Sequence, residues 1–208
     1  MPLSFLVIDD FYTDPRAIRQ TALSLDYPAP KTPPNFPGRN SRQKLLVKGI
    51  EEIVSGLVNE PLVGSTRDAH GHCRISLAAD DAKRRYYVHI DPTADWSGIL
   101  YLSLPEHCRG GTEFYRHKEL DSDRAPIYEH EIKALGASSY PEAADRIIQR
   151  DSNDLSKWNH LMTIPMRFNR LILLRPWLWH TAGPSFGDSL ENGRLVQLFF
   201  FARKPARD

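Results

Sequence analysis

The 208-residue sequence has little cysteine, almost no net charge and no long apolar run. Its two cysteines, Cys73 and Cys108, are too few for a disulfide framework and neither lies in a Cys-x-x-Cys pair, so we expect reduced thiols. The net charge of +1 gives no long-range field, and we therefore predict neither nucleic acid nor a membrane as a partner. No stretch approaches the roughly 18 apolar residues that span a bilayer. The first ten residues lack the apolar core of a signal peptide, so we expect a cytoplasmic protein.

A small cluster of His70, His72 and Cys73 has the residue types of a metal site. A tetrahedral zinc site, however, usually draws a second pair of ligands from elsewhere in the chain. We interpret the cluster as a polar turn that enters a strand.

Residues 1–70 are predicted to form one strand and two helices. The strand is Phe5–Ile8, and Asp14 followed by Pro15 is typical of a helix start, with the helix continuing to about Leu25. Apolar residues at helical spacing from Ile50 onward predict the second helix. Between the helices, residues 27–38 contain five prolines, which indicates a surface loop or the wall of an active site.

From His72 onward the pattern changes to short β-rich runs separated by Gly, Pro and Asp. The closing run, residues 195–201, is apolar nearly throughout, as expected for a strand buried on both faces. About eight strands suit a mainly β fold, a double-sheet jelly roll with flanking helices. The predicted strands beyond residue 72 are 73–78, 85–90, 98–104, 111–115, 161–165, 171–174, 178–181 and 194–201.

The whole chain, residues 1–208, is predicted to be a single domain. Its jelly-roll core comprises residues 72–119 and 160–203. Residues 120–158 are polar and favour helices, so they interrupt the strands as an insertion or lid.

The motif with the clearest chemistry is His89-Ile90-Asp91. In a strand, residues i and i+2 point to the same face, so the imidazole and the carboxylate project together. A third ligand must come from a distant strand, and His180 follows an aromatic run 91 residues later. Two imidazoles and one carboxylate occupy one face of an octahedron and leave three positions open, as in non-haem Fe(II) oxygenases.

A basic residue, Arg194, lies fourteen residues beyond His180 at the start of the last predicted strand. The planar guanidinium suits a carboxylate because it offers two parallel charge-assisted hydrogen bonds. Arg194 is therefore placed to hold the far carboxylate of a dicarboxylate that chelates the metal. The alternative is a solvated arginine at a strand end.

Several segments between residues 85 and 201 together resemble the 2-oxoglutarate/Fe(II)-dependent oxygenases, particularly the prolyl-hydroxylase-like branch. The resemblance implies a double-stranded β-helix, cupin-like fold with iron bound by His89, Asp91 and His180. It also implies that Arg194 binds the C5 carboxylate of 2-oxoglutarate, and it makes Tyr101 a second candidate for a hydrogen bond to 2-oxoglutarate. The matching segments are Tyr87–Asp91, Gly98–Ser103, Gly110–Phe114, Trp179–His180 and Arg194, whereas Val196 stands where the family often has serine.

The activity that the resemblance implies is hydroxylation by a 2-oxoglutarate-dependent dioxygenase. Molecular oxygen would be consumed and succinate released, with a small molecule, an amino acid or a peptidyl side chain as substrate. Asp91 argues against a related halogenase, in which a small residue replaces the carboxylate. Two alternatives stay open: a non-catalytic jelly-roll protein that binds a metal or ligand, and a cupin-type dioxygenase that works without 2-oxoglutarate.

Overall fold

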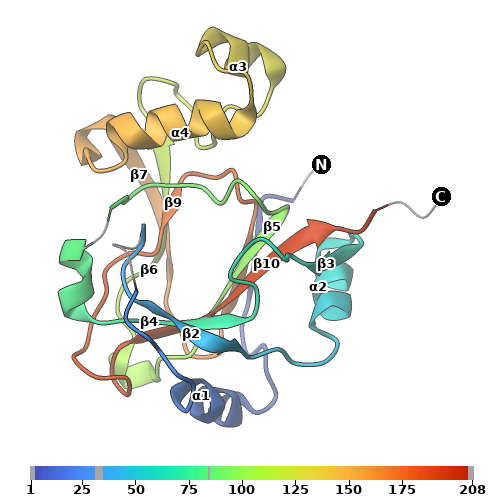
Figure 1. Ribbon diagram of the computed structural model, residues 1–208, viewed down its shortest axis with the longest axis vertical. Coiled ribbons are helices and arrows are strands. Elements are labelled where there is room, and N and C mark those ends of the chain that lie inside the picture. The colour runs from blue at the N-terminus through green and yellow to red at the C-terminus, as the bar shows by residue number, and fades with distance from the viewer. Residues whose placement is uncertain (1–2, 31–34, 84, 206–208) are drawn as a thin grey trace.

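The structure, a computed structural model, describes residues 3–30, 35–83 and 85–205. Its centre is a pair of β-sheets, with helices at the periphery (Figure 1). The larger sheet has the order β1-β8-β5-β10-β4-β2, and β3 also pairs with β10. Its strands are β1 (Phe5–Ile8), β2 (Arg39–Lys44), β3 (Leu62–Gly64), β4 (His72–Ser76), β5 (Trp96–Tyr101), β8 (Leu171–Leu174) and β10 (Arg194–Arg203).

The smaller sheet has the order β7-β6-β9 and consists of β6 (Gly111–His117), β7 (Trp158–Pro165) and β9 (His180–Thr181). Apolar side chains from both sheets form one buried cluster, including Phe114 and Ile164 from the smaller sheet and Ile172 and Leu198 from the larger. All strand pairs are antiparallel. The predicted fold, mainly β in a double-sheet jelly roll, is thereby confirmed.

Strand β10 is buried on both faces, as predicted. Val196 and Leu198 pack in the cluster between the sheets. Leu195 and Phe199 face the other way, into a second cluster that the N-terminal helices cover. Alternation along a strand therefore divides the core in two, and only the side of Arg194, Val196 and Leu198 reaches the space between the sheets.

Helices α1 (Pro15–Leu23) and α2 (Ile50–Val58) pack through Ala22 and Val54 onto the core cluster on the outer face of the larger sheet. The side chain of Asp14 accepts a 3.0 Å hydrogen bond from the backbone N–H of Ala17, which confirms the predicted helix start. Short 3-10 helices lie at Ala78–Lys83, Pro105–His107 and Leu155–Lys157. Within the described part of the chain, no helix is both long and apolar enough to cross a bilayer.

Helices α3 (Glu129–Ala134) and α4 (Tyr140–Asp151) lie between β6 and β7 in the sequence and project together at one end of the molecule (Figure 1, top). They fall within the predicted insertion, residues 120–158. The single-domain boundaries and the movement of this segment as a lid stay predictions.

The predicted strand at 85–90 is wrong. In the described residues of this segment only His89 forms a β-bridge, to His180. The backbone N–H of Val88 instead bonds the carbonyl of Ser152, and that of Tyr87 bonds the Ser152 hydroxyl. The end of α4 thus satisfies the polar backbone that a neighbouring strand would otherwise pair.

Candidate metal centre

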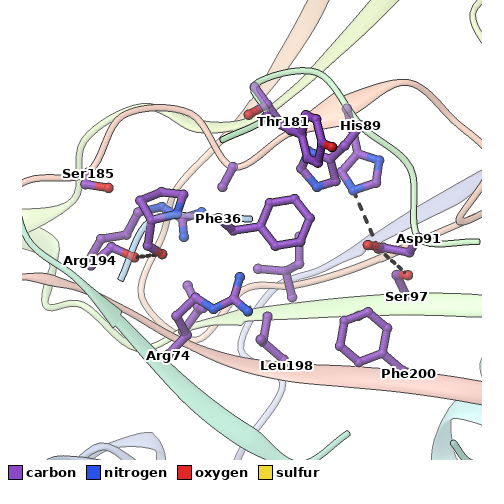
Figure 2. Close-up of a pocket in the computed structure, with 18 residues that line it drawn as sticks. Phe36, Arg74, His89, Asp91, Ser97, Thr181, Ser185, Arg194, Leu198 and Phe200 are labelled. Carbon is purple, nitrogen blue, oxygen red and sulfur yellow. Dashed lines mark hydrogen bonds and ion pairs between the residues drawn. The ribbon is translucent and has the colours of Figure 1, made fainter. Parts of the chain in front are cut away.

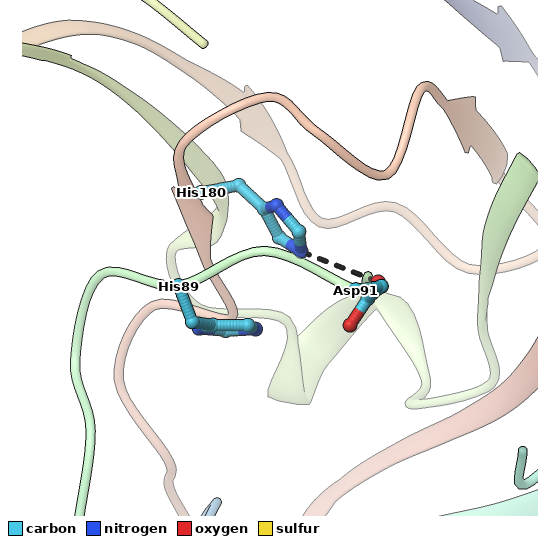
Figure 3. A group of neighbouring side chains, drawn as sticks. All are labelled: His89, Asp91 and His180. Carbon is cyan, nitrogen blue, oxygen red and sulfur yellow. Dashed lines mark ion pairs between the residues drawn. The ribbon is translucent and has the colours of Figure 1, made fainter. Parts of the chain in front are cut away.

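The side chains of His89, Asp91 and His180 converge although the two segments are far apart in sequence (Figure 3). One ligand atom from each residue lies within 4.8 Å of the other two. The Nε2 atom of His180 lies 3.6 Å from Oδ2 of Asp91. Among the residues that the structure describes, this is the one such group of three or more His, Cys, Asp or Glu side chains.

The two histidines are brought together by their backbones. The N–H of His89 donates to the carbonyl of His180 at 2.9 Å, and the N–H of His180 donates to the carbonyl of His89 at 3.0 Å. This bridge adds the His89 segment to the edge of the smaller sheet beside β9. The ring centroids are 4.5 Å apart, so both imidazoles face the same small volume.

Hydrogen bonds at Nδ1 set the tautomer of each imidazole. Nδ1 of His89 lies 3.0 Å from the carbonyl oxygen of Tyr87, and Nδ1 of His180 lies 2.8 Å from that of Leu178. Because a carbonyl oxygen only accepts, Nδ1 carries the proton in both rings. The lone pair of Nε2 is then available to a metal, and its direction is fixed by the Nδ1 bond.

Electrostatics at the site favour an ionised carboxylate and a neutral His89. Burial and the neighbouring His180 lower the pKa of His89 to about 3. Burial opposes ionisation of Asp91, but its contacts with His180, His89 and Ser97 outweigh that effect and lower its pKa to about 2. The Ser97 hydroxyl donates to Asp91 Oδ2 at 2.7 Å. The set of donors, two imidazoles and one carboxylate, fits a divalent transition metal with open positions for other ligands.

The three side chains border a cavity between the sheets (Figure 2). Phe36 forms part of its wall and packs against the imidazole of His89, with ring centroids 4.4 Å apart. Pro37 also lines it. The proline-rich segment therefore acts as a wall of the site through these residues, while residues 31–34 lie outside the described part of the chain.

Arg194 lines the same cavity from the start of β10 and is only 3% exposed. A solvated strand-end arginine is thus excluded by its burial. Tyr101 lies on the adjacent β5 and is fully buried, with its ring centroid 5.7 Å from the guanidinium carbon of Arg194. Its hydroxyl lies 2.7 Å from Oγ1 of Thr112 and the residue does not line the cavity, so direct contact with a co-substrate stays a prediction.

Two further residues that line the site, Arg74 and Ser97, were not predicted from the sequence, whereas Phe36 lies in the segment expected to form a surface loop or an active-site wall. Ser97 had a usable signal, because it is the second residue of the strand that follows the His-x-Asp motif. The signal for Arg74 was weaker, because the sequence alone does not say which face of the sheet its side chain takes. The pairing of Arg74 with Val196 in β10 decides that face.

The cluster of His70, His72 and Cys73 does not converge on a metal site. Nδ1 of His70 accepts a hydrogen bond from the backbone of Phe200, and Nδ1 of His72 lies 2.8 Å from the carbonyl oxygen of Ser41. Cys73 is buried in the core, and both cysteines are free thiols, as predicted.

Comparison with curated proteins finds no match. Among solved structures, the chain is similar to HygX from Streptomyces hygroscopicus, whose crystal structure holds nickel and 2-oxoglutarate. The TM-score is 0.51 at 15% sequence identity, and the match covers 96% of this chain and 83% of HygX. At this identity the likeness shows a shared fold. A family match, described as "Family of unknown function (DUF6445)", spans residues 3–201, and the chain therefore belongs to this family.

Proposed function

We propose that this protein is a non-haem Fe(II)- and 2-oxoglutarate-dependent oxygenase that hydroxylates a small molecule, an amino acid or a peptidyl side chain. The observation that carries the proposal is the convergence of His89, Asp91 and His180 on a cavity that Arg194 also lines. His89 and Asp91 come from a loop, His180 from β9 and Arg194 from β10, yet the fold brings all four side chains to one cavity.

The metal-binding part of the proposal follows from the donor atoms. His89 and His180 would each offer Nε2, and Asp91 would offer a carboxylate oxygen. This combination leaves half of an octahedral coordination sphere for co-substrate and oxygen. The nickel and 2-oxoglutarate in HygX support a metal and this co-substrate in a protein of the same fold. That the metal is iron, and that the protein is of the prolyl-hydroxylase-like branch, are parts of the proposal.

Arg194 would bind the far carboxylate of 2-oxoglutarate inside the cavity. Its burial makes a charge-assisted hydrogen bond stronger than it would be in water, and Tyr101 packs beside the guanidinium. Bound Fe(II) would supply the redox chemistry, in which oxygen and 2-oxoglutarate yield succinate, carbon dioxide and one hydroxyl group on the substrate. Phe36 and the apolar side chains of β10 would exclude water from the reacting groups.

A cytoplasmic enzyme that acts on a small or peptide substrate is part of this proposal. The near-neutral charge supports a partner other than nucleic acid or a membrane surface. The resemblance and the site geometry both favour this reaction over simple ligand storage, because storage has no need for a metal with open positions.

The test is an anaerobic titration of the protein with Fe(II) and 2-oxoglutarate. We expect a weak visible charge-transfer band in the wild type, its loss in His180→Ala, and an unchanged band in the control His160→Ala, whose histidine is exposed on β7. A non-catalytic jelly-roll protein gives no band. A cupin-type dioxygenase without 2-oxoglutarate binds iron but shows no band on addition of 2-oxoglutarate. A screen of amino acids and peptides for stimulated succinate release would then identify the substrate.

A further inference from the structure

A second arginine, Arg74, reaches the metal cavity from β4 (Figure 2). Its Nε donates a 2.7 Å hydrogen bond to Oδ1 of Asn40, its cross-strand neighbour in β2. Its guanidinium carbon lies 5.6 Å from the ring centroid of Phe36. These two contacts hold the side chain in one orientation. Within the described part of the chain, Arg74 donates a hydrogen bond through Nε alone. Its two terminal nitrogens can therefore donate to both oxygens of a planar anion such as a carboxylate.

Arg74 stands between the inner cavity and the surface. Together with Phe36 it lines the metal cavity and two neighbouring hollows that are more open. One hollow is bordered by the proline-rich segment and β2. The other contains Tyr86 and Asp145 and includes the metal ligands His89 and Asp91 in its wall. Arg74 therefore borders the metal cavity and both hollows beside it.

Arg74 lacks a carboxylate partner in the cavity once a metal is bound. Asp91 is the one acidic side chain among the described residues that line the cavity, and a metal would take it up. Arg74 would then face the cavity as a cation without a counter-charge from those residues. Burial, reinforced by Arg194 and opposed by Asp91, lowers the pKa of Arg74 to about 10, so the side chain stays protonated at neutral pH.

We infer that Arg74 binds a carboxylate of the primary substrate, and hence that the enzyme acts on a carboxylate-bearing molecule. Arg74 is partly buried, and a partly buried cation without a counter-charge is costly, a cost that a substrate carboxylate would lower. Arg74 also lines the hollow that contains Asp68 and Asp145, and those carboxylates disfavour an anion there, so the metal cavity is the better place for the acidic group. This inference rests on the proposed function, because it assumes that a metal takes up Asp91 and that Arg194 holds 2-oxoglutarate.

The test measures binding of radiolabelled butyrate by anaerobic equilibrium dialysis, with the protein first saturated with Fe(II) and 2-oxoglutarate. Butyrate should bind saturably and butyramide should not displace it. Arg74→Gln should weaken butyrate binding at least about tenfold, because a hydrogen-bonded charge pair is lost. Arg74→Lys should weaken it less, since the charge remains without the planar fork. Arg109→Gln, at an exposed arginine that does not line the cavity, should change nothing.

Each other result overturns the inference. Butyrate that does not bind saturably, or that binds equally well to Arg74→Gln, contradicts a carboxylate site at Arg74. A requirement for 2-oxoglutarate that rises as much in Arg74→Gln as in Arg194→Gln would make Arg74 a co-substrate residue instead. Circular dichroism melts check that both Arg74 variants are folded. Failure of the proposed function is recognised separately, as absence of the charge-transfer band in the wild type before butyrate is added.

Discussion

The hydroxyl of Ser97 donates a 2.7 Å hydrogen bond to Oδ2 of Asp91, the same oxygen that faces His180. Ser97 lies in β5, where it is opposite Phe200 of β10 on one side and Leu174 of β8 on the other. A loop carboxylate is thereby oriented by a strand inside the larger sheet. Such outer partners of a metal ligand usually contribute to metal affinity.

Replacement of Ser97 by alanine should weaken Fe(II) binding by about 10- to 100-fold, because the carboxylate of Asp91 loses the group that orients it. Anaerobic calorimetric titration measures the affinity. Ser138→Ala, at an exposed serine in the insertion, serves as the matched control. Equal affinities of the wild type and Ser97→Ala would show that Ser97 has no part in holding the metal ligand.

Arg194→Gln should raise the concentration of 2-oxoglutarate needed for half-maximal charge-transfer absorbance by at least about tenfold, because a buried charge-assisted pair is lost. Fe(II) affinity should stay within about threefold of the wild type, since Arg194 is not one of the metal-ligating group. A 2-oxoglutarate requirement unaffected by the substitution would favour the cupin-type alternative.

The buried Arg175 is a structural rather than a functional arginine. It forms an ion pair with Glu60, donates to the carbonyls of Leu3 and Asp95, and lies over the ring of Trp96 with its guanidinium carbon 4.0 Å from the centroid. Arg175→Met should lower the free energy of unfolding by about 1–3 kcal/mol, because the carbonyls of Leu3 and Asp95 lose their donor, whereas Glu60 keeps its ion pair with Arg203. Chemical denaturation measures this loss.

Arg203 provides the control, since it contacts the same Glu60 at 3.1 Å but its side chain is 59% exposed. Arg203→Met should cost no more than about 1 kcal/mol, as is usual for solvent-exposed ion pairs. Similar losses in the two variants would contradict the role assigned to burial.

The free energy of unfolding should depend on pH through Glu131 in α3. Its carboxylate accepts two hydrogen bonds from Arg124, at 2.8 and 2.9 Å. Arg124 first, and then the backbone N–H groups of Tyr128 and Ile127, lower the pKa of Glu131 from 4.5 to about 2, against the opposing effect of burial. A carboxyl group whose pKa is lowered by folding stabilises the folded state at pH values above its ordinary pKa. That contribution is lost as the pH falls from about 4.5 toward 2.

Glu131→Gln should therefore reduce the free energy of unfolding by about 1–3 kcal/mol at pH 7 and by less at pH 3. Denaturant titrations at the two pH values measure the difference. Glu129→Gln, whose carboxylate is 81% exposed, should change stability by only a few tenths of a kcal/mol at either pH. A loss in Glu131→Gln that is equal at pH 7 and pH 3 would contradict the linkage.

Strong local patterns made much of the fold predictable from the sequence. Strands Phe5–Ile8 and Leu171–Leu174 have the predicted bounds, and the Asp14-Pro15 helix start is present. Strand β2 was missed because its sequence, Arg-Asn-Ser-Arg-Gln-Lys, has no apolar alternation. Its place is set by pairing with β4, a long-range contact that local patterns do not report.

In the site, too, some features follow from local sequence and others from long-range pairing. Residue type and order were enough to select His89, Asp91 and His180, since few side chains ligate metals and their spacing follows a known pattern. The geometry arises differently from the expectation, because His89 lies in a loop with one β-bridge instead of a strand. Arg74 required the fold itself: an arginine in a strand has two possible faces, and the β2, β4 and β10 pairing decides which one.

The most direct test of the central claim is the crystal structure of the protein loaded anaerobically with Fe(II), with data collected at the iron absorption edge. The account predicts one anomalous peak within bonding distance of Nε2 of His89, Nε2 of His180 and a carboxylate oxygen of Asp91. A peak elsewhere, or one that omits either imidazole, would contradict it.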